Sequence, residues 1–188
     1  MNRITRKLVL TLAGTALVAP VGAVGVAQSA SADASGAKVT AASSVETKAT
    51  ISGTTVINRA KTWMTAHNGG PVPYSQSATY GGYRTDCSGY VSMAYGYGKP
   101  GLNTVGLADP SVSTRFTSKA NLRKGDTIID PNGTSTSRHV VIFEKWANDA
   151  KTSYWAYEQR GTYGTTHRKL SYGLKADAYD FYRQKKLA

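Results

Sequence analysis

The sequence predicts an α+β fold in which helices come first and antiparallel strands follow. Two observations lead to this prediction. Before residue 96, two segments show apolar residues at helical spacing or a helix cap followed by a helix-forming run. After residue 126, short runs rich in β-branched and aromatic residues are separated by turn sequences such as 131–133 and 148–149. We therefore expect N-terminal helices packed on a central antiparallel sheet.

The first 32 residues are expected to be a secretory signal peptide. Three basic residues precede position 8, residues 8–27 are apolar but interrupted by Gly and Pro, and Ala30–Ala32 gives the small-x-small pattern of a cleavage site. A membrane anchor is the alternative, and the interruptions disfavour it. No later segment approaches the length of about 18 apolar residues needed to span a bilayer. We expect a protein that is secreted, either extracellular or associated with the cell wall, without a transmembrane segment.

The exported part divides into a leader and one domain. Residues 33–53 are rich in small and polar types and are predicted to be a flexible linker or leader, whereas 54–188 is long enough for a single core. Three of the 23 basic residues and no acid lie in 1–32, so 33–188 carries 20 basic and 11 acidic residues, a net charge of +9. Such a charge favours anionic cell-wall polymers as partners, and export disfavours nucleic acid. A role in solubility alone is the alternative.

The elements of the domain are predicted from periodicity, caps and turn residues. The first half should contain a helix over 55–67 capped by Thr54 or Thr55, a polar loop over 74–83, a helix over 88–95 capped by Asp86, and a helical turn within 105–117. The second half should contain strands over 127–129, 139–146 and 152–158, with further short strands in 163–171 and 178–183.

Cys87, the only cysteine, is the candidate nucleophile. A single thiol makes no internal disulfide, and this one lies in the first turn predicted after Asp86. There the free N–H groups and the positive end of the helix dipole stabilise a thiolate. A small buried core residue is the alternative interpretation.

A thiolate nucleophile needs a base, and the chain has three histidines. His67 ends the first predicted helix, and His167 is placed in a basic turn. His139 begins an apolar strand and is the candidate base. The next strand runs antiparallel, so its end returns to the level of His139 with Glu158 and Gln159. Strand alternation allows only one of these two to orient the imidazole, and Glu158 is preferred for its charge. The histidines and the cysteine lack metal-ligand spacing, and no cofactor is expected.

The order of these motifs resembles the NlpC family of papain-like cell-wall cysteine peptidases. Residues 86–91 (Asp-Cys-Ser-Gly-Tyr-Val) resemble the family's nucleophile motif, 122–126 its Gly-Asp turn, and 139–143 its histidine strand. Pro73-Tyr74 matches a Pro-Tyr whose hydroxyl lies near the catalytic sulfur in the family. The spacing of 19 positions between His139 and Glu158 is more similar to the spacing in the related CHAP amidases. The subfamily and the third catalytic residue therefore stay open.

The resemblance implies a papain-like NlpC/CHAP fold and hydrolysis of amide bonds in peptidoglycan by Cys87, His139 and Glu158. Tyr74, Ser88 and Asp86 would support the oxyanion and the nucleophile. We expect a monomer. Two alternatives stay open: an acyltransferase or transglutaminase-like enzyme with the same triad, and an exported binding or toxin-like module without activity.

Overall fold

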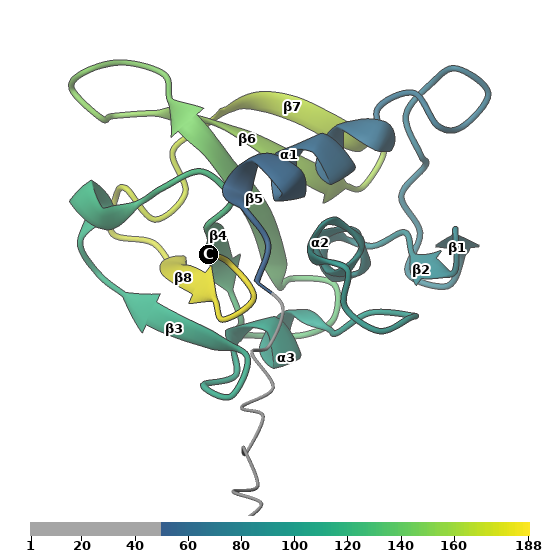
Figure 1. Cartoon of the computed structure of the whole chain (residues 1–188), viewed down its shortest axis with the longest axis horizontal. Helices are drawn as coiled ribbons and strands as arrows, with labels where there is room; N and C mark the ends of the chain where they lie inside the picture. Colours follow the sequence, from purple (N-terminus) through teal and green to yellow (C-terminus); the bar gives the residue numbers. More distant parts are fainter. Residues whose placement is uncertain (1–49) are drawn as a thin grey trace, which may run out of the picture. The chain divides into compact units, whose positions relative to one another are not determined.

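The computed structural model describes residues 50–188, which form a mixed α+β domain (Figure 1), as the sequence predicted. The elements follow one another as α1 (Gly53–Thr62), β1 (Thr79–Tyr80), β2 (Tyr83–Arg84), α2 (Cys87–Tyr95), α3 (Thr104–Ala108), β3 (Ser113–Phe116), a 3₁₀ turn (Lys119–Asn121), β4 (Thr127–Asp130), β5 (His139–Trp146), β6 (Tyr154–Arg160), β7 (Gly164–Leu170) and β8 (Asp180–Gln184). The predicted signal peptide and nearly all of the predicted linker lie outside the described residues. No helix within 50–188 has the length and apolar character needed to cross a lipid bilayer.

Six strands form one antiparallel sheet in the order β3-β8-β4-β5-β6-β7. The neighbours β4, β5, β6 and β7 are consecutive in the chain and are joined by turns. Residue His139 of β5 pairs with Asp130, the last residue of β4. The first residue of β5 therefore lies at the end of the sheet, where loops and helix ends can reach it.

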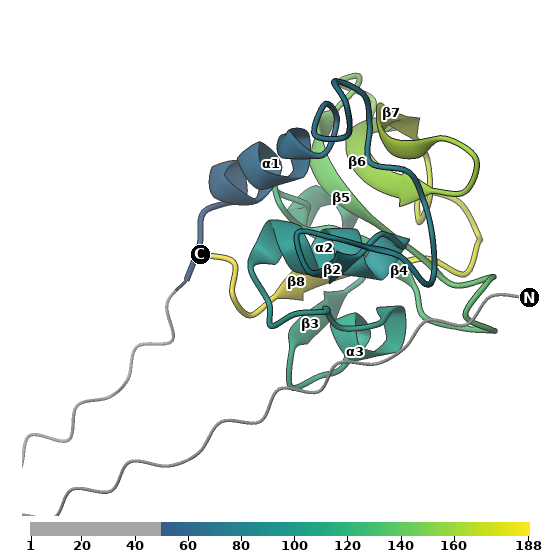
Figure 2. The same cartoon turned by 90° about the vertical axis from the view of Figure 1, so that its right-hand side faces the viewer.

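The sheet is covered on both faces, because neighbouring residues of a strand point to opposite sides. Val140 and Ile142 belong to a buried cluster with α1 and α2, whereas Val141 and Phe143 belong to a second cluster with β4 and β8. In Figures 1 and 2, both helices lie on the same side of β5 and β6. This arrangement brings the start of α2 to the end of β5.

Helix α2 is the central buried element of the domain, and eight of its nine residues are buried. It begins after Asp86, whose side chain accepts a hydrogen bond from the Gly89 N–H, and ends at Gly96 in the left-handed conformation (φ 64°). A helix fixed by both caps and by burial on all sides holds its first residue, Cys87, in a defined position.

Some boundaries differ from the predictions. Helix α1 is capped by Ser52 rather than Thr54 or Thr55, since the Ser52 hydroxyl accepts from the Thr55 N–H. Ile51, assigned to the linker from the sequence, pairs with Leu187 at the C-terminus, and its N–H donates to the Lys186 carbonyl at 2.7 Å. The folded domain thus includes Ile51–Gly53.

Two further elements were not predicted, because the local sequence does not indicate them. The predicted polar loop at 74–83 contains the hairpin β1–β2, whose turn is Gly81-Gly82. The segment predicted as a helical turn divides into α3 and the edge strand β3. β3 pairs with β8, and this distant pairing is not evident from the local sequence.

Candidate active site

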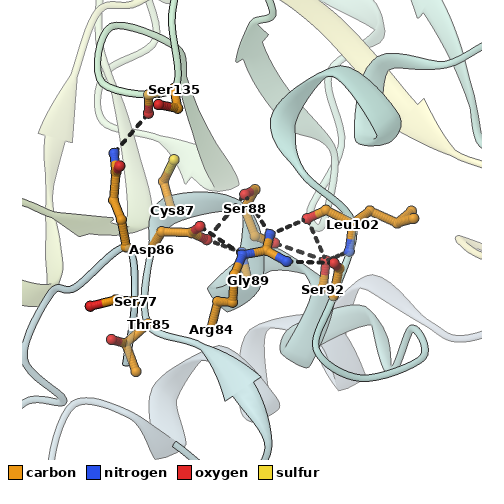
Figure 3. Close-up of polar contacts among 12 residues, drawn as sticks. Ser77, Arg84, Thr85, Asp86, Cys87, Ser88, Gly89, Ser92, Leu102 and Ser135 are labelled. Carbon is orange, nitrogen blue, oxygen red and sulfur yellow. Dashed lines mark hydrogen bonds and ion pairs between the residues drawn. The ribbon is translucent and has the colours of Figure 1, made fainter. Parts of the chain in front are cut away.

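Asp86 and Arg84 fix the entrance to α2 (Figure 3). Asp86 Oδ1 accepts from the Gly89 N–H at 2.6 Å and from the Ser88 hydroxyl at 3.1 Å, and Oδ2 accepts from Arg84 Nε at 2.8 Å. The remaining Arg84 nitrogens donate to the carbonyl oxygens of 101 and 102 and to the Ser88 hydroxyl. Asp86 and the Ser88 side chain therefore hold the helix start, and both are fully engaged in that role.

Gly89 is required by the close approach of the β2 strand to this turn. A Cβ atom at position 89 would lie 2.2 Å from the Arg84 carbonyl oxygen, a distance that no real contact allows. The glycine of the nucleophile motif thus lets the Arg84 backbone lie directly against α2. This packing brings the guanidinium of Arg84 to the Asp86 cap.

The Cys87 side chain points away from this network and toward the loop that carries Ser135 (Figure 3). Its residue exposure is 6%, and Sγ lies 4.0 Å from the carbonyl oxygen of Arg138. The N–H groups of Cys87 and Ser88 have no hydrogen-bond partner within residues 50–188. The sulfur accordingly lies beside two free donors at the N-terminus of a nine-residue helix.

His139 lies between Cys87 and Glu158. Its Nε2 is 2.8 Å from Glu158 Oε2, which leaves Nδ1 for the thiol. Burial lowers the pKa of His139, but hydrogen bonds with Cys87 and Glu158 and the negative charge of both raise it by more, to about 9. The arrangement favours a protonated imidazole beside Cys87 near neutral pH.

Glu158 is completely buried, and both of its carboxylate oxygens make hydrogen bonds. Oε2 contacts His139, while Oε1 accepts from Arg168 Nε and lies 3.5 Å from the Thr166 hydroxyl. Burial raises the pKa of Glu158, but the hydrogen bonds and positive charges of His139 and Arg168 hold it below its usual value. The carboxylate is therefore ionised and cannot rotate away from the imidazole.

Arg168 is a site residue that the sequence analysis missed, and so are two tyrosines beside His139. Arg168 also donates to the Tyr172 hydroxyl at 3.0 Å. The rings of Tyr172 and Tyr179 stack at 4.5 Å, and both meet His139 edge-on, with centroids 6.1 and 6.5 Å away. They restrict the imidazole to one plane. Only the pairing of β6 with β7 brings Arg168 to the same side of the sheet as Glu158.

Gln159 points to the other side of β6, as strand alternation requires, and does not contact His139. Its amide nitrogen donates to the carbonyl oxygens of Val72 (3.0 Å) and Thr85 (3.1 Å), and its oxygen accepts from Thr165 (2.6 Å). Gln159 thereby links β6 to the segments that lead into Tyr74 and Cys87. It has a positioning role that the sequence analysis did not foresee.

We expect Gln159→Leu to lower the free energy of unfolding by about 1–3 kcal/mol, because it removes three buried hydrogen bonds. It should also lower activity per folded molecule, since the Thr85 carbonyl directly precedes the nucleophile turn. Gln184→Leu is the matched control: Gln184 is equally buried and donates to Leu107 and Thr127, away from the cleft. Urea unfolding and activity assays should show similar destabilisation in both variants. Equal activity of the two folded variants would contradict the positioning role.

A cleft of about 220 Å³ opens at Cys87. It is lined by Tyr74, Gln76, Arg84, Asp86, Cys87, Ser88, Asn103, Thr104, Ser135 and Arg138. Burial raises the pKa of Tyr74; a hydrogen bond from Gln76 lowers it, and negative charge on Cys87 and Asp86 raises it again. The phenol consequently stays protonated and is a hydrogen-bond donor at the cleft.

The other two histidines do not contact this site. His67 pairs with Gly70 in the turn after α1. His167 lies within strand β7, not in a turn as predicted; it pairs with Glu144 at 2.9 Å and stacks on Tyr157 at 4.2 Å. Within residues 50–188 there is no cluster of metal-ligating side chains.

The raised pKa of His139 predicts how stability depends on pH. The folded protein holds this proton up to about pH 9, whereas an unfolded chain releases it near 6.5. The contribution of protonated His139 to the free energy of unfolding should be complete below pH 6.5 and lost as pH rises through 9. This contribution should be at most about 3 kcal/mol. Urea unfolding across this window should show the decline, and His139→Gln should flatten it. A wild-type free energy of unfolding that is constant between pH 6.5 and 9 would contradict the prediction.

Comparisons of the chain with protein families, with curated proteins and with solved structures found no match.

Proposed function

We propose that this protein is a cysteine hydrolase that cleaves amide bonds of peptidoglycan, as an endopeptidase or amidase. The observation that carries the proposal is the position of His139 between Cys87 and a fully buried, ionised Glu158 at the edge of a cleft. A nucleophile, a base and an orienting carboxylate in this order are the parts that acyl-transfer catalysis needs. A purely structural cysteine needs none of them.

The geometry supports the following reaction. The Cys87 thiolate attacks the amide carbonyl carbon, and the N–H groups of Cys87 and Ser88 stabilise the oxyanion, with the Tyr74 hydroxyl as a further donor. The His139 imidazolium gives its proton to the leaving amine, and the C–N bond breaks. Neutral His139 then takes a proton from water, which attacks the thioester and releases the acid and the thiol. Glu158 holds the tautomer and stabilises the imidazolium.

Peptidoglycan is the proposed substrate for two reasons. The nucleophile motif and the histidine strand resemble those of NlpC/CHAP wall hydrolases, and the chain after residue 32 carries a net charge of +9. A basic protein is attracted to the anionic polymers of a bacterial wall. We propose secretion and a papain-like fold on the same grounds: the N-terminal pattern of basic, apolar and small residues, and a nucleophile helix packed on an antiparallel sheet.

The test is digestion of purified peptidoglycan by residues 33–188, with mass spectrometry of the released fragments. Fragments that depend on Cys87 establish a wall hydrolase, and their masses identify the bond. The assay should be repeated with an added amine: incorporation of the amine instead of water would show an acyltransferase. Absence of fragments, together with a Cys87 that an electrophilic amide probe does not label, would favour a binding module and refute the proposal.

A further inference from the structure

The cleft contains charged groups that the proposed reaction does not use. Two arginines line it, and they differ in their surroundings. All three guanidinium nitrogens of Arg84 are engaged, by Asp86, Ser88 and two backbone carbonyls. The Arg138 side chain, by contrast, makes no hydrogen bond or ion pair with any residue in the described range, and its Nε is buried without a partner.

A buried N–H of a guanidinium without a partner is costly, so it needs an explanation. Neither neighbouring loop supplies a carboxylate, because 74–83 and 131–137 contain no charged residue. Asp130, which borders the second loop, accepts from the backbone and side-chain nitrogens of Asn132. Asp86 lines the cleft but is paired with Arg84 at 2.8 Å. The cleft therefore keeps one uncompensated positive charge beside the nucleophile.

The place of Arg138 in the chain directs its side chain toward the bound substrate. It directly precedes His139, and its carbonyl oxygen lies 4.0 Å from Cys87 Sγ. It stands two positions before Val140, whose side chain packs on the α2 side of the sheet. Alternation along an extended chain directs Arg138 to that same side, where the cleft opens.

We propose that Arg138 binds a carboxylate of the substrate close to the scissile amide, so that the enzyme selects acidic acyl peptides. The inference deepens the proposed function and rests on it. Arginine suits this task because its planar fork makes two parallel hydrogen bonds to a carboxylate. Stem peptides whose carboxylates are free would be cleaved in preference to those whose carboxylates are amidated.

The test compares two forms of the stem peptide released from peptidoglycan, one with free carboxylates and one converted to carboxamides. Wild type should show a kcat/KM about 10–100-fold lower on the carboxamide form. Arg138→Gln should lose a similar factor on the carboxylate form and show little preference between the two; Arg138→Lys should recover part of it. Arg123→Gln, an exposed arginine outside the cleft, is the control and should behave as wild type.

Binding measurements separate this inference from the proposed function. Cys87→Ala and Cys87→Ala/Arg138→Gln are titrated with the same two peptides by calorimetry, which needs no turnover. Tighter binding of the carboxylate form only when Arg138 is present supports the inference, even if wild type cleaves neither peptide. Cleavage by wild type with equal rates and equal binding for both forms would overturn the inference and leave the hydrolase intact. Absence of both cleavage and binding would overturn both.

Discussion

Replacing Cys87 by alanine is expected to lower activity by roughly 10⁵–10⁶-fold, the size of loss seen when the nucleophile of an acyl-transfer triad is removed. Alanine cannot form the thioester, and none of the other residues lining the cleft is a cysteine. The ratio of wild-type to variant activity is obtained from the release of peptidoglycan fragments, measured by mass spectrometry. Residual activity should be equal to that of the assay without enzyme.

The fold must be shown to survive this change. The change to alanine removes a single sulfur atom at the cleft, so the far-UV spectrum should be unchanged and the melting temperature should stay within about 5 °C. A folded Cys87→Ala protein that retains wild-type activity would refute the catalytic assignment.

Replacing Glu158 by glutamine is expected to lower activity by roughly 10²–10⁴-fold. Glutamine keeps the size of the side chain but removes the negative charge that stabilises protonated His139. Since that charge helps to raise the pKa of His139 to about 9, the loss of activity at alkaline pH should begin at a lower pH in the variant. The measurement is kcat/KM as a function of pH.

A second histidine–glutamate pair on the same sheet provides the control. His167 and Glu144 are 2.9 Å apart, close to the 2.8 Å between His139 and Glu158, and neither lines the cleft. Glu144→Gln should leave both the rate and the pH profile near wild type. If the two variants changed activity equally, the effect would belong to the stability of the sheet, and Glu158 would lose its assigned role.

The main elements were predictable because their signals are local. The Asp86 cap and the glycine at 96 mark both ends of α2, and the β-branched run after His139 marks β5. Strand alternation was sufficient to state that Glu158 and Gln159 face opposite sides. It also followed from the antiparallel connection that the end of β6 returns to His139.

What could not be predicted depends on pairings between distant segments. Arg168 reaches Glu158 only because β7 pairs with β6 in one register, and a shift by one residue would turn it to the other side. Two of the three hydrogen-bond partners of Gln159, the carbonyl oxygens of Val72 and Thr85, lie 87 and 74 positions away. The placement of His167 in a turn was wrong for a related reason. Its basic neighbours suggested an exposed side chain, whereas its ring pairs with Glu144 and stacks on Tyr157.

Cys87 has no second thiol in the chain to protect it. If an oxidant converts its sulfur to sulfenic acid, no internal cysteine can trap that product as a disulfide. Reversal then depends on a small external thiol that can enter the cleft, and further oxidation to sulfinic acid is permanent. Under the proposed function, oxidation of Cys87 beyond sulfenic acid would limit how long each molecule stays active in an oxidising environment.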